Sequence, residues 1–324
     1  MDIFCDGGRF EIGPEMRVVF MGTPQAAVPS LEKLLSGGHD VAAVYTQPDR
    51  PSGRGNKITF SPVKEFALSH NLRVFQPLKV RTPEALEEFR SHKADAAVVV
   101  AYGRILPETF LNAFSKGAIN VHFSLLPKYR GAAPVNWAIV NGEAETGVTT
   151  MQMDVGLDTG PMLLQRSTAI GESENAVELM ERLSFVGAEL LSETLSRLDQ
   201  ILPIEQVHEN ATLAPIMKRE AGLIDWNMRA VDIANRIRGF QPFPTAFTMA
   251  DGQKLTFWRA NAVESEDAGV AGQVIAAKGD ELLVVCGERT VLSVAELQPE
   301  GKRRMTTRDF LNGTKLAAGD ILGV

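Results

Sequence analysis

The sequence is poor in cysteine, in long apolar runs and in positive charge. Its two cysteines, Cys5 and Cys286, stand at opposite ends of the 324-residue chain, with no Cys-x-x-Cys pair and no histidine cluster nearby. This excludes a disulfide framework and gives no zinc-binding pattern, so we expect no metal site and a reducing, cytoplasmic location. The longest apolar run, Ala96 to Tyr102, is far short of the roughly 20 residues that span a bilayer, so we expect no contact with membranes.

Basic residues are outnumbered 33 to 40, which gives a net charge of −7. That excludes a protein whose whole surface is built to bind nucleic acid, so a polyanion would have to be held by a local patch. Residues 211–324 carry equal numbers of acidic and basic side chains, and the acidic excess therefore belongs to residues 1–210. Two basic groups stand out in the second half: Lys302-Arg303-Arg304 with Arg308 and Lys315, and Lys218, Arg219, Arg229, Arg236 and Arg238. An ordinary solvated face is the alternative for both.

The length predicts two domains, and a 44% hydrophobic, 23% charged composition is typical of a globular protein. Residues 1–15 lack the pattern of a signal peptide, and we expect them to form a tail before a second methionine, Met16. Translation could start at Met1 or at Met16. The predicted division is a tail 1–15, an α/β domain 16–203, a polar, proline-bearing linker 204–215 and a second domain 216–324.

From Met16 onward, strand-like and helix-like patterns alternate. This alternation, with strands apolar on both faces, predicts a doubly wound, Rossmann-like and mostly parallel sheet. The expected strands are Arg17–Met21, Val41–Tyr45, Arg73–Phe75, Ala94–Ala101, Gly117–His122 and Gly147–Met153. The expected helices are Pro29–Leu35, Val63–Leu68, Pro83–Phe89 and the long Glu172–Leu198. Short strands at Lys254–Trp258, Gly272–Ala276, Glu281–Val285 and Val291–Val294 then predict a small β-barrel.

Ligand sites in such sheets lie beyond the carboxyl ends of the strands. Met21–Pro24 has a single glycine and a proline without an N–H, which argues against a dinucleotide site. Asn120 and His122 end a strand two residues apart, so their side chains share one face. Asp154 and Asp158 occupy a glycine-bearing loop after another strand. Asn120, His122 and an aspartate of this loop, Asp154 or Asp158, are thus the best catalytic candidates, although structural roles and ordinary turn chemistry stay open as alternatives.

These residues resemble the folate-dependent formyltransferases, which share Asn120-x-His122-x-Ser124-Leu-Leu-Pro127 and Gly156-x-Asp158-Thr-Gly160. Further stretches, from Met16 nearly to the C-terminus, are similar to the methionyl-tRNA formyltransferase branch of that superfamily. They are Phe20–Pro24, Thr46–Gly55, Ser61–Lys64, Val98–Pro107, Gly147–Gly160, Ile224–Trp226, Gln241–Pro244 and Gly301-Lys302.

The resemblance implies transfer of a formyl group from 10-formyltetrahydrofolate to the α-amine of methionyl initiator tRNA, without a metal. Asn120 and His122 would stabilise the oxyanion, while Asp158 would keep His122 protonated and accept the amine proton. The implied folate-binding residues are Arg104, Ile105, Leu106, Ser124, Leu125, Leu126 and Pro127; plain core packing is the alternative for Ile105 and Leu106. The implied tRNA-binding residues are Arg50, Arg54 and Lys57 of the loop 49–57, and Lys302, Arg303 and Arg304 of an OB-like C-terminal barrel. The resemblance also implies a monomer.

The chain departs from the family pattern at Gln25, Ala26 and Pro161, which leaves amino-acid selectivity open. The nearest rival enzyme is a formyltransferase of the same fold that acts on a sugar-nucleotide amine or on glycinamide ribonucleotide, or a formyltetrahydrofolate hydrolase. A non-catalytic RNA-binding protein is the alternative from another class, and a nicotinamide dehydrogenase is disfavoured by the missing glycine pattern.

Overall fold

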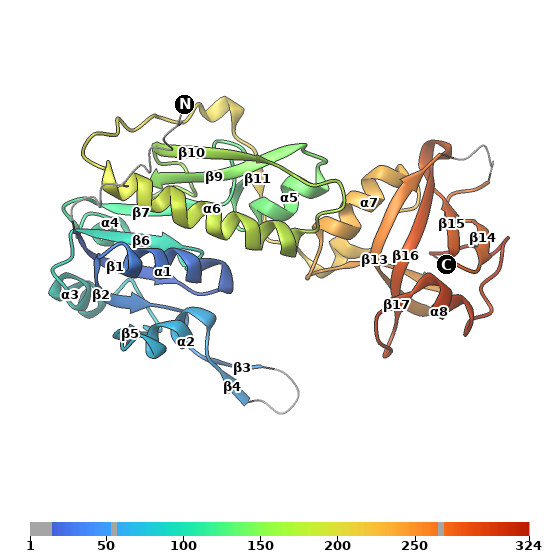
Figure 1. Cartoon of the computed structure of the whole chain (residues 1–324), viewed down its shortest axis with the longest axis horizontal. Coiled ribbons are helices and arrows are strands. Elements are labelled where there is room, and N and C mark those ends of the chain that lie inside the picture. The colour runs from blue at the N-terminus through green and yellow to red at the C-terminus, as the bar shows by residue number, and fades with distance from the viewer. Residues whose placement is uncertain (1–14, 53–56, 265–268, 324) are drawn as a thin grey trace, which may run out of the picture. The chain divides into compact units, whose positions relative to one another are not determined.

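The computed structural model describes residues 15–52, 57–264 and 269–323. Contacts divide the chain into two compact units, which are described one at a time (Figure 1). The first unit holds the described residues up to Lys128, together with Gly147–Arg166 and Arg182–Ala211. The second holds Tyr129–Thr146, Ser167–Glu181 and the described residues from Thr212 onward. No helix in these described ranges has the length and apolarity to cross a membrane.

The described residues of the first unit build on a seven-stranded sheet of order β10-β9-β7-β6-β1-β2-β5. Its strands are β1 (Arg17–Gly22), β2 (Asp40–Tyr45), β5 (Val74–Phe75), β6 (Ala96–Val100), β7 (Ala118–His122), β9 (Glu145–Gln152) and β10 (Met162–Ala169). Parallel pairing joins β5, β2, β1, β6 and β7, and β9 runs antiparallel to β7. The predicted Rossmann-like, mostly parallel sheet is confirmed. Strand β10 was not predicted, because half-exposed polar residues interrupt its apolar pattern.

Helices cover both faces of this sheet. They are α1 (Val28–Ser36), α2 (Pro62–Ser69), α3 (Pro83–Ser91), α4 (Glu108–Leu111) and α6 (Ala176–Ser196), with the short η1 (Gln25–Ala27) before α1 and η2 (His208–Asn210) after α6. Figure 1 shows α1 and α6 over one face, where Lys33 of α1 bonds Glu189 of α6 at 2.7 Å. On the other face Phe89 of α3 and Phe110 of α4 join the core formed by the β1, β2 and β6 side chains. The alternation of β1 explains this, since Val19 and Met21 face that core.

The helix starts follow the sequence signals. Ser61 accepts a hydrogen bond from the Lys64 amide, and Thr82 accepts one from the Ala85 amide, each just before a proline at the first helical position. The long helix α6 begins with a capping box, in which the Asn175 side chain accepts from the Glu178 amide and the Glu178 carboxylate accepts from the Asn175 amide. The confirmed helix is therefore shorter than the predicted Glu172–Leu198.

In the second unit the described strands form a mainly antiparallel sheet of order β12-β13-β16-β15-β14, with β17 beside β16. They are β12 (Ala246–Ala250), β13 (Gln253–Val263), β14 (Val274–Lys278), β15 (Glu281–Val285), β16 (Val291–Pro299) and β17 (Met305–Thr306). The helices are α5 (Pro134–Val140), α7 (Ala230–Gly239), α8 (Thr307–Leu311), η3 (Arg219–Gly222) and η4 (Gly287–Arg289), and a short pair joins β8 (Arg130–Gly131) to β11 (Leu213–Ala214). The predicted strands are present. Closure into an OB-like barrel stays a prediction.

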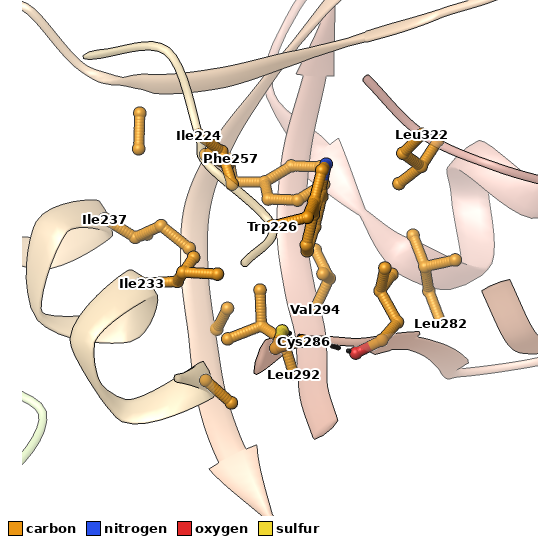
Figure 2. Close-up of a cluster of buried hydrophobic side chains, with 14 of the residues drawn as sticks. Ile224, Trp226, Ile233, Ile237, Phe257, Leu282, Cys286, Leu292, Val294 and Leu322 are labelled. Carbon is orange, nitrogen blue, oxygen red and sulfur yellow. Dashed lines mark hydrogen bonds between the residues drawn. The ribbon is translucent and has the colours of Figure 1, made fainter. Parts of the chain in front are cut away.

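One apolar core holds this sheet and α7 together (Figure 2). Ile233 and Ile237 of α7 lie in the same buried cluster as Trp226, Phe257 and strand residues of β14 to β16. The Trp226 indole donates to the Thr248 hydroxyl at 3.1 Å, so its one polar atom is satisfied inside the core. Helix α7 was not predicted, although its buried Ala230, Ile233 and Ile237 have helical spacing.

Helix α5 explains why residues 129–146 group with the second unit. Gly239 at the end of α7 comes so close to α5 that a Cβ there would lie 2.7 Å from Val140 Cγ2. The Asn136 amide donates to the Gly239 carbonyl at 2.7 Å. Contact grouping thus cuts across the predicted domain 16–203, and the domain boundaries stay a prediction.

Candidate active site

The first two candidate side chains come from strand β7. Asn120 and His122 are 8% and 6% exposed, and β7 lies between β6 and β9. The Asn120 side-chain amide makes no hydrogen bond to any other residue that the structure describes. Buried amides normally have partners, so an unpartnered one at the carboxyl end of a parallel strand is available to a ligand.

The third candidate comes from the loop after β9. Asp158 adopts φ +52°, a left-handed conformation that a non-glycine residue seldom takes. Its Oδ2 lies 3.7 Å from His122 Nδ1, within ion-pair distance. The structure therefore brings the predicted histidine and aspartate together, although 36 positions separate them in the sequence.

Local bonds fix the shape of this loop. The Asp154 carboxylate accepts from the Gly156 amide at 3.0 Å and from the Thr159 hydroxyl at 2.7 Å. Gly160 is needed for close approach, since a Cβ there would lie 2.0 Å from the Gln152 carbonyl oxygen. Asp154 thus acts as a turn residue, the alternative that the sequence left open for it.

Strands β9 and β10 hold the predicted folate segment 124–127. The Thr149 hydroxyl donates to the Ser124 carbonyl at 2.6 Å and accepts from the Leu126 amide at 3.1 Å. The Gln165 amide donates to the Leu126 carbonyl at 2.8 Å. The Ser124 hydroxyl donates to the Lys128 carbonyl at 2.7 Å, so this side chain shapes the segment from within.

The other predicted folate segment, 104–106, separates into different roles. The Arg104 guanidinium donates to Gln47 Oε1 at 3.1 Å and to the Leu78 carbonyl at 2.7 Å. Ile105 is 63% exposed, whereas Leu106 is buried in the apolar core. Leu106 therefore packs in the core, as the alternative held, whereas Ile105 does not.

Two open cavities meet beside this segment. One of about 710 Å³ is lined by Ile105 and by the cations Arg50, Lys79, Arg81 and Arg104. The other, of about 500 Å³, is lined by Thr23, Asp49, Phe60 and Ser61. Both include Gln47, Arg50 and Gly103. An apolar surface beside several cations suits an anionic ligand with a flat hydrophobic part.

The predicted tRNA loop forms a hairpin of β3 (Arg50–Ser52) and β4 (Lys57–Thr59). Arg54 lies outside the described residues, as does the side chain of Lys57. At the base of the hairpin, Lys64 Nζ bonds Asp49 Oδ2 at 2.5 Å and Gln76 Oε1 at 2.8 Å, and it lies 3.9 Å above the centre of the Phe60 ring. Hydrogen bonding from Lys64 and Gln76 lowers the pKa of the Asp49 carboxyl.

The predicted cations of the second unit are of two kinds. Lys302 and Arg303 are exposed and have no ion-pair partner among the described residues. Arg304 Nε donates to Glu296 at 2.5 Å, and its guanidinium lies 5.1 Å from the centre of a Trp258 ring. Arg229 is likewise paired with Asp232, and Arg238 donates to the carbonyls of residues 171 and 174. Part of the basic charge of the second unit, including Arg304 and Arg229, is therefore paired with carboxylates.

Sequence reasoning gave no role to five further side chains that shape the site. They are Gln47, Lys64, Thr149, Gln165 and Gln206. Gln47, Lys64 and Thr149 stand in stretches that carried the family resemblance, but the resemblance assigned them no role. Nothing in the sequence singles out Gln206. Within the described ranges no group of three or more His, Cys, Asp or Glu side chains is arranged to hold a metal ion.

Two family models match the chain. The model described as "Formyl transferase" matches residues 16–195, and "Formyl transferase, C-terminal domain" matches residues 216–315. A methionyl-tRNA formyltransferase of Caldanaerobacter subterraneus subsp. tengcongensis is 52% identical over 310 residues, covering 95% of this chain and 100% of its own length. One from Alkaliphilus oremlandii is 49% identical with the same coverage.

Solved structures show the same fold at low identity. An N-formyltransferase from Helicobacter canadensis, in complex with folinic acid and dTDP-3-aminofucose, matches with a TM-score of 0.65 at 18% identity, over 88% of this chain and 100% of that one. HypX from Aquifex aeolicus, in complex with tetrahydrofolic acid, matches with a TM-score of 0.62 at 16% identity. That match covers 92% of this chain, which spans about half of HypX, 47%. By the matching family models and the relatives near 50% identity, the chain belongs to the formyl transferase family and, within it, to the methionyl-tRNA formyltransferases.

Proposed function

We propose that this protein transfers the formyl group of 10-formyltetrahydrofolate to the α-amino group of methionyl initiator tRNA. The observation that carries the chemistry is the grouping of an unpartnered Asn120 amide with a His122–Asp158 pair at the carboxyl end of the sheet. The relatives near 50% identity support the acceptor, because they match this chain over almost its whole length under that name.

The acceptor amine needs no activation by a nucleophile of the protein. An α-amino group has a pKa of roughly 7.7–8, so a large neutral fraction exists near pH 7. In our proposal the amine nitrogen forms a bond to the formyl carbon, and the bond from that carbon to N10 of the folate breaks. The residues must therefore stabilise an oxyanion and move two protons.

Each side chain suits one of these tasks. Asn120 donates its amide hydrogens to the oxyanion, and no other described residue competes for them. His122 gives a proton to N10 as that nitrogen leaves, and Asp158 takes the proton that the amine loses, directly or through water. The 3.7 Å between His122 Nδ1 and Asp158 Oδ2 is longer than a direct hydrogen bond, so in our proposal one bridging water returns the proton to the histidine afterwards.

We further propose that the cavities beside Arg104 and Ile105 hold the folate, with segment 124–127 lining the same site. Arg50, Arg54 and Lys57 of the hairpin, together with Lys302, Arg303 and Arg304, would contact the tRNA. Phosphate contacts of this kind make affinity fall steeply with salt. We also propose that the protein is a cytoplasmic monomer and that its two domains span residues 16–203 and 216–324.

The test is a formylation assay with purified Asn120→Ala, His122→Ala and Asp158→Asn variants. Each variant should keep the melting temperature of the parent protein within a few degrees, while removal of the Asn120 donor lowers kcat by about 10²–10³. Turnover of the parent with 10-formyltetrahydrofolate is measured with charged initiator tRNA, with an amino-sugar nucleotide and with no acceptor. Formylation of the nucleotide instead of the tRNA would reject the proposed acceptor, and near-normal kcat in a variant would reject that residue's role.

A further inference from the structure

Gln206 is the one buried side chain in an otherwise exposed stretch of the first unit. It is 4% exposed, whereas the residues at 202–205 and 207–210 are all exposed, including the apolar Leu202, Ile204 and Val207. A polar side chain buried among exposed apolar neighbours is the reverse of ordinary surface packing, so its position needs a specific cause.

The cause is the loop that carries Asp158. Gln206 Nε2 donates to the Asp158 carbonyl at 2.9 Å and to the Gly160 carbonyl at 2.7 Å. A primary amide has two N–H donors, and both are used here on carbonyls two residues apart. The bonds therefore clamp the backbone on each side of Thr159 and fix the direction in which the Asp158 side chain leaves the chain.

A short bridge holds Gln206 in place. Met162 and Ile204 exchange a pair of antiparallel backbone hydrogen bonds, each of 2.8 Å. Ile204 stands two residues before Gln206, and Met162 stands two residues after Gly160. The bridge therefore sets the register between the two segments and brings the Gln206 amide to its carbonyls.

The loop requires such support because its conformation is unfavourable. Asp158 has φ +52°, which costs free energy for a residue with a Cβ and persists only where the surroundings enforce it. Within the loop, the Thr159 hydroxyl donates to the Asp154 carboxylate. Gln206 adds support at the Asp158 carbonyl from a distant part of the chain.

We propose that Gln206 is a positioning residue that sets the separation between the Asp158 carboxylate and the His122 imidazole. The inference rests on the proposed role of Asp158. Its consequence is that the segment around residue 206, outside both family-model matches, belongs to the working parts of the active site.

Gln206→Met tests this, because methionine keeps the length and volume of the side chain but has no donor. We expect kcat to fall about 10–100-fold, the size of effect that small misplacements of reacting groups produce, with KM for both substrates within about twofold. Glu205→Gln is the matched control: it changes an exposed neighbour and should leave kcat unchanged.

A double-mutant cycle separates positioning from general destabilisation. If Gln206 acts through Asp158, then Gln206→Met should cause no further loss of kcat in an Asp158→Asn background. An equal fold-loss in both backgrounds, or a kcat of the single variant within twofold of the parent, would overturn the proposal. Should Gln206→Met not fold, Gln206→Asn keeps the amide on a chain one methylene shorter and should show a smaller loss with the same non-additivity.

The readout also separates this inference from the proposed function. The cycle uses whichever acceptor the parent protein formylates, so a different acceptor would reject the proposed function and leave the Gln206 result intact. If Asp158→Asn alone had normal turnover, both the role of Asp158 and the positioning role of Gln206 would fall.

Discussion

At the scale of single residues, hydrogen-bond partners separate side chains that act on a ligand from those that shape the protein. Ser124 and Asp154 belong to the motifs that the sequence made conspicuous, yet both spend their polar atoms on nearby backbone or loop groups. Asn120 is buried, as Ser124 is, but its side-chain amide has no such partner among the described residues. The difference is invisible in the sequence because the partners come from other strands and loops.

The basic run 302–304 gives a prediction at this scale. Arg303→Ala should weaken tRNA binding and reduce the slope of log Kd against log salt by about one, because an exposed cation that meets a phosphate releases counterions. Arg304→Ala should change the slope less, since Glu296 already neutralises that guanidinium. Binding isotherms recorded at salt concentrations between about 50 and 200 mM give the slope for each variant. Equal slopes in Arg303→Ala and the parent protein would remove Arg303 from the interface.

At the scale of elements, the network at the base of the β3–β4 hairpin links several parts of the first unit. The Lys64 ammonium from α2 meets Asp49, which directly precedes β3, and Gln76, which follows β5. Gln76 in turn donates to the Gln47 carbonyl at 2.8 Å, and Gln47 accepts from Arg104. The hairpin is thereby anchored to the same residues that line the cavities.

Lys64→Met should therefore impair the hairpin more than the chemistry. We expect KM for tRNA to rise about fivefold, equivalent to roughly 1 kcal/mol for lost charge-assisted hydrogen bonds, while kcat at saturating tRNA changes little. Lys33→Met is the control, since Lys33 forms an ion pair with Glu189 on the surface of helices α1 and α6. Steady-state kinetics at fixed salt provide the comparison, and an unchanged KM in Lys64→Met would show that the anchor does not serve tRNA binding.

The helices and strands also show which parts of the fold could be predicted from the sequence. Strand β6 was predictable because Ala96–Val100 is apolar on both faces, and α6 because Asn175 and Glu178 form a capping box. Strand β10 and helix α5 were missed, since the first is a half-exposed edge and the second is a seven-residue helix whose stability comes from packing on α7. Of the site, strand-end logic found Asn120, His122 and the loop that carries Asp154 and Asp158, and the family resemblance then selected Asp158. It could not find Gln206, whose role depends on a backbone bridge between Met162 and Ile204, two residues that are 42 positions apart in the sequence.

At the scale of the whole molecule, a fall in pH should lower the folding stability of the first unit through a buried histidine. His92 is 4% exposed, bonds the Tyr45 hydroxyl at 2.8 Å and packs edge-on against Phe75 and Phe89. Burial lowers the pKa of His92, and the nearby charges of Arg73 and Arg17 lower it further.

The sign of the pH effect follows from proton linkage. The unfolded chain binds a proton at His92 once the pH falls through about 6.5, while the folded protein does so only at lower pH. The contribution of His92 to stability is therefore present above about pH 6.5 and is lost as the pH falls toward the lowered value. The drop in urea midpoint between about pH 7.5 and 5.5 should be smaller in His92→Gln, which cannot titrate, than in the parent protein. The exposed His70→Gln serves as control, and an equal drop in all three proteins would contradict the assignment.

The core of the second unit has a consequence for the chemistry of thiols. Cys286 is 3% exposed within the cluster of Figure 2, its thiol faces the Val284 carbonyl, and burial raises its pKa to about 12. The reactive thiolate is therefore almost absent at neutral pH while this core stays closed. A reagent that labels Cys286 must wait for the core to open, so the rate of labelling at this sulfur measures how often the core of the second unit opens.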